Sequence, residues 1–94
     1  MTRIEKLGES EVHRRVAERP GWTIENGKLT KTFQFKSFMQ GIAFVNQVAA
    51  VAEEMDHHPD IAIRFGLITI ALTTHEARGI TERDFAQAAR LDAL

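Results

Sequence analysis

A dipeptide that favours a tight turn lies between two short segments near the start of this chain, and this arrangement constrains the fold most strongly. The dipeptide is Asn26-Gly27, and residues 22–24 and 29–35 flank it. Asn-Gly readily adopts the positive φ angles of a two-residue hairpin turn. Residues 29–35 alternate large side chains with threonine and glutamine, which is typical of a strand with one buried face. These residues therefore predict a β-hairpin.

A second hairpin is predicted further along the chain. Residues 61–65 and 67–73 are rich in β-branched side chains and meet at Gly66. This composition favours two strands joined by a turn. Because each hairpin is local, the four strands can pair without a parallel crossover. We therefore expect a four-stranded antiparallel sheet.

Three helices are expected around these hairpins, over residues 10–19, over residues 38–56 and from residue 81 onward. Ser10, Ser37 and Thr81 are the expected N-caps. Asp84 lies three residues after Thr81, which is the spacing of a capping box. The order α-β-β-α-β-β-α predicts an α+β fold with three helices on one face of the sheet. At this length residues 1–94 are expected to form a single domain.

Composition excludes several classes of function. The chain has 12 Lys and Arg and 13 Asp and Glu residues, mixed along its length. No basic run could neutralise a row of phosphates, so direct nucleic-acid binding is not expected. The chain has no cysteine, which excludes disulfides and thiolate metal sites. Residues 1–19 lack the apolar core of a signal peptide and no segment is long enough to span a membrane, so we expect a cytoplasmic location and no membrane partner.

Three of the four histidines lie where secondary-structure elements are expected to end. His57 and His58 follow the long helix, and His75 follows the last strand. Imidazole exchanges protons near neutral pH, so histidines from separate elements could divide acid and base roles at a ligand. A purely structural reading stays open, because a helix dipole favours histidine near a C-terminus. His13 stands alone on the first helix and is expected to face solvent without a role.

A metal site is an alternative reading of the same region. Glu53, His57, His75 and Asp84 could supply ligands if they converged. Their spacing matches none of the common zinc patterns. We therefore expect no metal.

The combined spacing of these residues forms a longer pattern. In order, it consists of Glu53, three residues, His57-His58-Pro59, five residues, Phe65, nine residues, His75, eight residues and Asp84. This pattern resembles the signature of the pterin-4a-carbinolamine dehydratase family. The likeness continues outside the pattern, from Gly21-Trp22 to the run at residues 79–84, and so covers most of the chain.

The resemblance implies an enzyme that removes water from a pterin-4a-carbinolamine, 4a-hydroxytetrahydrobiopterin, to give the quinonoid dihydropterin. Such enzymes recycle the pterin used by aromatic amino acid hydroxylases. No metal or organic cofactor is implied. The family's fold, a four-stranded antiparallel sheet with three helices on one side, agrees with the fold predicted above. A homodimer or homotetramer is also expected, because a small sheet leaves an edge or an uncovered face for a second copy.

By position, the resemblance assigns catalytic and pterin-binding roles to His57, His58 and His75. The residues that match neighbours lining the pterin pocket are Asp56, Thr73, Thr74 and Glu76. We expect His57 and His75 to form the acid–base pair, because the leaving oxygen needs a proton while a ring nitrogen loses one. His58 is expected mainly to orient the substrate, because adjacent side chains tend to point apart.

Asp84 and Glu53 are expected to support the site. Asp84 matches the acid of the family's motif, although its capping-box position could account for it alone. Glu53 could orient His57, four residues later on the same helix, or remain a solvated charge. The aromatic residues are expected to be core rather than a stacking platform; they are Trp22, Phe33, Phe35, Phe38 and Phe44.

The chain departs from the family pattern after the histidine pair. Many members have an acid followed by Trp and then a Tyr-Asn pair, whereas this chain has Asp60, Ile61, Phe65 and Gly66. In the wider family, animal forms also act as dimerisation cofactors of a homeodomain transcription factor, and related bacterial and plant forms assist assembly of the carbon-fixing carboxylase. The alternative function is therefore a non-catalytic interaction or assembly module on the same fold.

Overall fold

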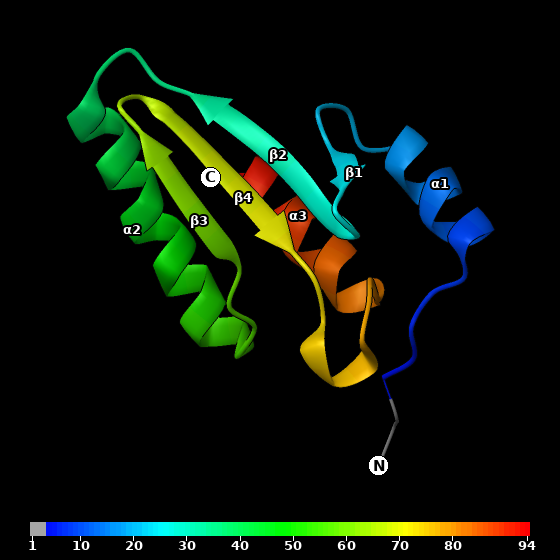
Figure 1. Cartoon of the computed structure of the whole chain (residues 1–94). Coiled ribbons are helices and arrows are strands. Elements are labelled where there is room, and N and C mark those ends of the chain that lie inside the picture. The colour runs from blue at the N-terminus through cyan, green and yellow to red at the C-terminus, as the bar shows by residue number, and fades with distance from the viewer. Residues whose placement is uncertain (1–3) are drawn as a thin grey trace.

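The structure, a computed structural model, describes residues 4–94 and contains helices and strands in the predicted order. The elements are α1 (Glu9–Ala17), β1 (Thr23–Glu25), β2 (Lys28–Gln34), α2 (Phe38–Met55), β3 (Asp60–Arg64), β4 (Leu67–Leu72), the short 3-10 helix η1 (His75–Ala77) and α3 (Glu82–Asp92). The strands form one antiparallel sheet in the order β1-β2-β4-β3. Helices α2 and α3 lie against one face of this sheet, and α1 lies beside β1 (Figure 1). The structure confirms the predicted α+β fold.

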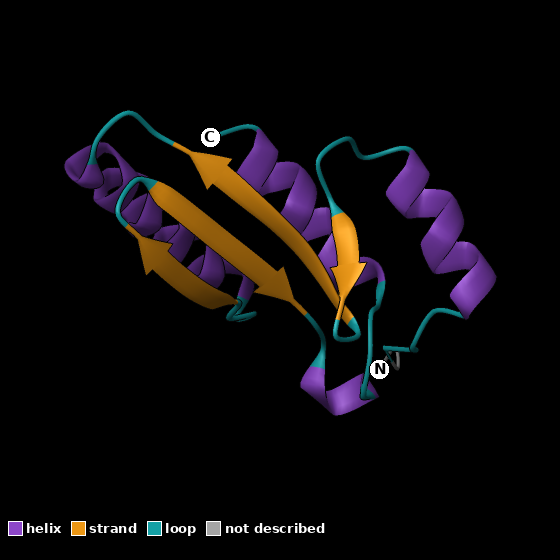
Figure 2. Ribbon diagram, turned by 45° about the horizontal axis from the view of Figure 1, so that its top comes forward, coloured by secondary structure: helices purple, strands orange, loops and turns teal. Residues whose placement is uncertain are grey.

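The turned view in Figure 2 shows helices along one side of the sheet. The buried side chains of the core come from both the sheet and the helices. Register places Leu29 of β2 opposite Leu72 of β4 and Phe33 opposite Ile68, so these side chains share one face. The fully buried Val48 of α2 packs into the same cluster. Full burial of one such side chain stabilises the fold by about 1.5–3 kcal/mol. The alternation read from the sequence therefore sets which face of the sheet is covered.

Turns and caps at three of the expected positions form as predicted. Asn26 and Gly27 both have positive φ, 52° and 75°, in the β1–β2 turn. The Ser37 hydroxyl accepts a hydrogen bond from the Gln40 backbone N–H at 3.1 Å. Thr81 begins α3 with the expected capping box. The two caps satisfy backbone N–H groups that the start of a helix would otherwise leave unpaired.

The start and end of the first helix differ from the prediction. Ser10 is not its cap, because α1 begins at Glu9 after Gly8, which makes no side-chain cap bond. Before the helix, the Leu7 backbone N–H donates to Ile80 O at 2.9 Å and fixes where the chain turns. Acidic residues in the first turn compensate the helix dipole there. The helix also ends at Ala17, two residues earlier than expected.

Two phenylalanines also differ from the prediction. Phe65 was expected at the end of a strand, but it lies in the β3–β4 turn with a φ of 51° and is 70% exposed. Phe38 was expected in the core and is 44% exposed at the start of α2. The start of α2 packs beside that turn, since a Cβ at Gly66 would lie 3.5 Å from Ser37 O. Both aromatic rings are therefore at one end of the sheet. The other four expected core aromatics are buried or partly buried in the cluster.

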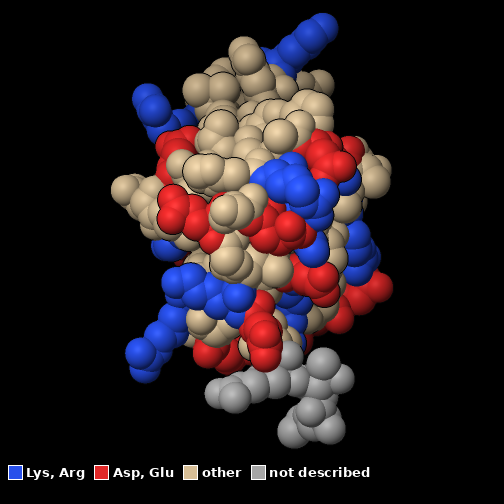
Figure 3. Space-filling model, turned by 90° about the vertical axis from the view of Figure 1, so that its right-hand side faces the viewer, with Lys and Arg blue, Asp and Glu red and all other residues tan. Residues whose placement is uncertain are grey.

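Charged side chains of both signs are interspersed on the face that carries α1 (Figure 3). Arg14 donates to Glu11 at 2.6 Å and to Glu18 at 3.0 Å, and Arg15 donates to Glu11 at 2.8 Å. The hydrogen bonds from Arg14 and Arg15 lower the pKa of Glu11 to about 2.

Within residues 4–94, none of the helices is both long enough and apolar enough to cross a membrane.

Candidate active site

A pocket of about 410 Å³ lies at the end of the sheet where α2 and β4 both finish. Its lining combines most of the expected site residues with one that the sequence reasoning missed: Asp56, His57, His58, Thr73, His75, Glu76 and Arg83. These residues come from the C-terminal end of α2, the end of β4, η1 and the first turn of α3. The fold therefore gathers the three histidines around one pocket.

The end of α2 separates the two adjacent histidines. Asp56 adopts the left-handed conformation with a φ of 50° and reverses the chain; Asp is one of the few residues other than Gly that do so readily. The His57 backbone N–H then donates to Ala52 O at 3.0 Å. As a result His57 is only 6% exposed, whereas the side chain of His58 is 57% exposed. The two side chains differ in environment, as expected of neighbours that point apart.

His57 is held by three contacts. Its Nε2 lies 2.9 Å from Thr73 O and 3.0 Å from Asp84 Oδ1, so Nε2 carries the proton that Thr73 O accepts. The Gln87 side-chain N–H donates to His57 O at 2.8 Å. The other ring nitrogen, Nδ1, is buried and has no hydrogen-bond partner within the described residues.

Asp84 serves both helix α3 and His57. Its Oδ2 accepts from the Thr81 backbone N–H at 2.8 Å and from the Thr74 hydroxyl at 2.9 Å, while Oδ1 faces His57. Burial raises the pKa of the Asp84 carboxyl, although these hydrogen bonds and the nearby His57 oppose the rise. Asp84 therefore closes the capping box of α3 and also contacts His57. Its structural role in the helix and its expected role in supporting the site are compatible.

Thr74 was expected to line the pocket, but it lies behind it. Its side chain is 1% exposed, and its hydroxyl is 2.7 Å from the Thr81 hydroxyl as well as bonded to Asp84. The alternation of buried and less buried side chains in β4 continues for two residues beyond its end at Leu72, so Thr74 is buried and Thr73 is not. Thr73 lines the pocket and also orients His57 through its carbonyl oxygen.

Glu53 contacts His58 rather than His57. Its Oε2 lies 2.5 Å from His58 Nε2, and the two side chains are 78% and 57% exposed. The left-handed turn at Asp56 interrupts the helical spacing that would have placed Glu53 beside His57. An ion pair this exposed contributes at most about 1 kcal/mol.

His75 and Glu76 lie on η1, a turn that the sequence reasoning did not predict. The Thr74 N–H donates to Gly79 O at 2.9 Å and the Gly79 N–H donates back to Thr74 O at 3.3 Å. These bonds close the loop at its base and present both side chains outward. Arg83 enters the pocket from the first turn of α3; its place beside Asp84 in the motif was the only signal for it in the sequence.

Comparison with known proteins identifies the family. The family model described as pterin 4 alpha carbinolamine dehydratase matches residues 5–94. A relative from Chloroflexus aurantiacus is 47% identical over 89 residues, which cover 95% of this chain and 96% of the relative. One from Sulfolobus acidocaldarius is 43% identical over 89 residues, covering 95% and 98%. Both are named, provisionally, as pterin-4-alpha-carbinolamine dehydratases.

The chain belongs to the pterin-4a-carbinolamine dehydratase family.

Two solved structures of similar proteins extend this finding. The crystal structure of a transcriptional coactivator/pterin dehydratase from Brucella melitensis has a TM-score of 0.88 and 33% identity, covering 95% of this chain and 97% of that one. A pterin dehydratase-like protein, described as a RuBisCO assembly factor in the alpha-carboxysome, has a TM-score of 0.62 and 33% identity, covering 77% and 83%. The dehydratase fold is therefore shared by proteins with different described roles.

The departures from the family pattern lie outside the pocket. None of Asp60, Ile61, Phe65 and Gly66 is among its lining residues. Ile61 packs against the core, and Phe65 lies beyond the far end of β3. The replacements therefore leave the histidine pocket of this dehydratase-family chain in place.

The alternative metal set does not assemble. Within residues 4–94, no three His, Cys, Asp or Glu side chains are grouped so that they could hold a metal ion. His57 and Asp84 are in contact, but Glu53 is directed to His58.

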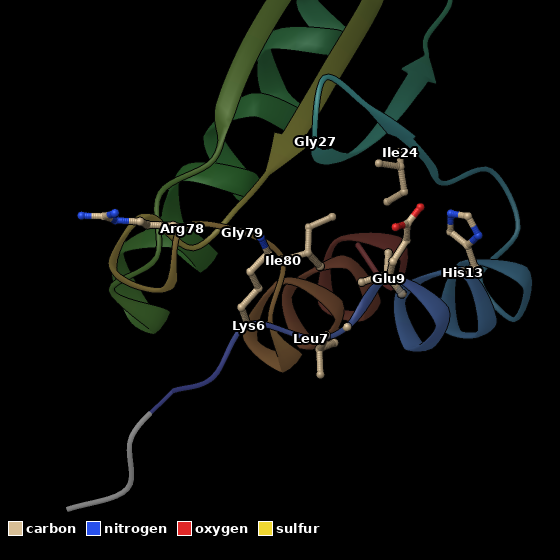
Figure 4. A pocket seen from close by; sticks show the side chains of 11 residues that line it. Lys6, Leu7, Glu9, His13, Ile24, Gly27, Arg78, Gly79 and Ile80 are labelled. Carbon is tan, nitrogen blue, oxygen red and sulfur yellow. The ribbon is translucent and has the colours of Figure 1, made fainter.

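A larger hollow of about 580 Å³ lies away from the histidines, between α1, the β1–β2 turn and residues 78–80. Figure 4 shows Ile24 and Ile80 on its walls, with Glu9 and His13 together on one side and Lys6 on the other. His13 is exposed there, as expected. This hollow contains none of the residues that match the family's motif.

Proposed function

We propose that this protein removes water from a pterin-4a-carbinolamine, with 4a-hydroxytetrahydrobiopterin as substrate and quinonoid dihydropterin as product. The observation that carries the proposal is that His57, His58 and His75, from two separate parts of the chain, line one pocket. Family membership and the names of the relatives support the same reaction class. The reaction recycles a pterin and needs no metal or organic cofactor.

The reaction requires two proton movements. The C4a–O bond breaks as the leaving hydroxyl takes up a proton, and the neighbouring ring nitrogen releases one as the C=N bond forms. We assign these tasks to His57 and His75. The Asp84 carboxyl at 3.0 Å suits His57 to hold a positive charge when it gains a proton. His75 projects from η1 with its side chain exposed, so it can exchange protons with both the substrate and water.

The remaining residues bind and orient the flat pterin ring. Among residues 4–94, the His58 side chain is held by the exposed Glu53 alone, which suits an orienting role better than a proton relay. Asp56, Thr73 and Glu76 supply oxygen acceptors around the pocket. The Thr74 hydroxyl donates to Asp84 on the side away from the pocket. We propose that Thr74 affects the substrate only indirectly, by positioning Asp84.

The test is the rate at which freshly generated 4a-hydroxytetrahydropterin loses water, followed by ultraviolet absorbance. The wild-type protein should accelerate dehydration over buffer, and His75→Ala should lower the enzymatic rate by about 10²- to 10⁴-fold, the usual effect of one positioned acid or base. His13→Ala is the matched control, because His13 is also exposed but lies outside the pocket. A wild-type rate equal to that of buffer would refute the proposal.

An interaction or assembly module is the second candidate. Its support is an end of the molecule where apolar side chains are exposed, together with the described role of the RuBisCO assembly factor. The exposed residues around the start of α2 and the β3–β4 turn are Phe38, Met39, Ile63, Phe65 and Leu67. Phe65→Glu should leave dehydration unchanged and weaken only partner binding. A pull-down that recovers a stoichiometric partner from the wild type and not from Phe65→Glu would favour this candidate.

A further inference from the structure

The hollow beside α1 has a volume of about 580 Å³, against about 410 Å³ for the histidine pocket, and the two share no lining residue. Its volume lies within the range of roughly 300–1,000 Å³ that is usual for small-molecule sites. The dehydratase reaction proposed above gives this hollow no role. Its shape, walls and charges therefore have to be explained separately.

Three separate segments build the hollow, and a hydrogen bond joins two of them. The Leu7 backbone N–H donates to Ile80 O at 2.9 Å, which holds the chain before α1 against residues 78–80. The β1–β2 turn supplies the third segment through Gly27, and nothing lies within 4 Å of the position that a Cβ on Gly27 would take. The fold thus sets the shape of the hollow and leaves its side at Gly27 open.

The walls of the hollow are apolar. Val12 of α1 and Ile80 belong to the buried core, and Ile24 of β1 is partly buried and packs against it. Figure 4 shows the side chains of Ile24 and Ile80 on these walls. Apolar walls with a few polar groups around them are typical of sites that bind small organic molecules.

A carboxylate lies on one side of these walls. Glu9 and His13 are four residues apart on α1, so both side chains lie on the helix face that borders the hollow (Figure 4). Glu11 and Glu18 on the same helix both pair with Arg14. Glu9 forms none of the ion pairs found within residues 4–94. Its carboxylate is therefore available to a cationic group of a ligand.

A cation, Lys6, lies on the other side (Figure 4). Its alkyl chain passes over Gly79, where a Cβ would lie 2.7 Å from Lys6 Cε. The missing side chain at Gly79 thus makes room for Lys6 at the hollow. Lys6 also takes part in none of the ion pairs within residues 4–94. Arg78 is the second cationic lining residue, but Figure 4 shows its side chain directed away from Lys6 and Ile80.

We propose that this hollow binds a small zwitterion whose positive and negative ends are separated by an apolar body, as in an apolar dipeptide. The ammonium end pairs with Glu9, the carboxylate end pairs with Lys6, and the body lies against Ile24 and Ile80. Charge pairs beside apolar walls are stronger than in bulk water, because the effective dielectric constant is lower. A free α-amino acid does not match this arrangement, since both of its charges are attached to one carbon. A fatty acid has no group for Glu9.

The experiment measures dissociation constants by calorimetry for three probes. They are leucyl-leucine, its N-acetyl form, which lacks the cation, and its C-terminal amide, which lacks the anion. The wild type should bind leucyl-leucine at least about tenfold more tightly than either derivative, equivalent to about 1.4 kcal/mol. Glu9→Gln should abolish the preference over the N-acetyl form, and Lys6→Met should abolish the preference over the amide.

Two variants outside the hollow are the matched controls. Glu18→Gln changes a carboxylate on the same helix, and Lys36→Met removes a lysine charge elsewhere. Both should keep the preferences of the wild type. The proposal is overturned if the wild type binds none of the probes at millimolar concentration, if it shows no preference among them, or if Glu9→Gln and Lys6→Met both keep that preference.

Amide chemical shifts measured by NMR during a leucyl-leucine titration locate the site. Shifts should centre on residues 6–13, Gly27 and residues 78–80. Shifts confined to the lining of the histidine pocket would place the peptide there and would overturn the proposal. Each of these results leaves the dehydratase proposal unchanged, because no residue lines both sites.

Discussion

Asp84 divides its two carboxyl oxygens between helix α3 and His57. Asn at this position has one acceptor oxygen, which can keep the hydrogen bonds from Thr81 and Thr74. Its amide N–H₂ group then faces the N–H at Nε2 of His57. Two donors in contact disrupt the orientation of the ring.

We therefore predict that Asp84→Asn keeps most of its stability but loses about 10²-fold in dehydration rate. Asp84→Ala should lose activity and also about 1–3 kcal/mol of unfolding free energy, because it leaves the buried donors of Thr81 and Thr74 unpaired. Thermal unfolding and turnover of the two variants separate the roles. Wild-type activity in a folded Asp84→Asn would show that Asp84 is only a cap.

At the scale of elements, the turn between β3 and β4 is locked against the end of β2. The Phe35 backbone N–H donates to Gly66 O at 2.8 Å. A Cβ on Gly66 would lie 2.4 Å from Phe35 O and 3.2 Å from Phe35 C, which are backbone atoms that cannot rotate away. Gly66, which the sequence marked both as the turn of the second hairpin and as a departure from the family, is thus required by packing.

Gly66→Ala should lower the unfolding free energy by about 1–3 kcal/mol, the usual cost of overpacking. Gly8→Ala is the control, because nothing lies within 4 Å of a Cβ at that position. Urea denaturation of both variants measures the difference. Equal midpoints for Gly66→Ala and the wild type would contradict the close approach.

At the scale of the whole molecule, Asp92 joins the end of α3 to the segment between α1 and β1 and to β2. It accepts from Lys31 Nζ at 2.8 Å, from Trp22 Nε1 at 2.9 Å and from Arg19 at 3.1 Å. Partial burial raises the pKa of Asp92, but these hydrogen bonds outweigh it and hold the pKa below its usual 3.8.

A carboxyl whose pKa is lower in the folded than in the unfolded chain stabilises the fold above the unfolded pKa, and that contribution is lost as pH falls through the folded pKa. Asp92→Ala should cost about 2 kcal/mol at pH 7. The difference from wild type should shrink below about pH 4. Urea midpoints at pH 7 and pH 3 test this; a constant difference would exclude ionisation of Asp92 as its source.

The edge strand β3 is the predicted contact for a second copy. Ile63 on β3 is 43% exposed, whereas the uncovered sheet face carries the polar contact between the Thr32 and Thr69 hydroxyls at 2.8 Å. Exposed edges readily pair with another chain. We predict that Ile63→Lys lowers the molar mass measured by light scattering and that Thr32→Lys does not. A mass lowered only by Thr32→Lys would assign the contact to the sheet face.

Local patterns in the sequence determined the element order, the Asn26-Gly27 turn and the caps at Ser37 and Thr81, because these depend on neighbouring residues alone. Motif spacing pointed to the family, and the resemblance to that family implied most of the residues that line the pocket. Only the tertiary structure placed Arg83 in the pocket, Thr74 behind it and Glu53 on His58. These depend on the left-handed turn at Asp56, on η1 and on how α3 packs against the end of β4, which are contacts between residues far apart in the chain.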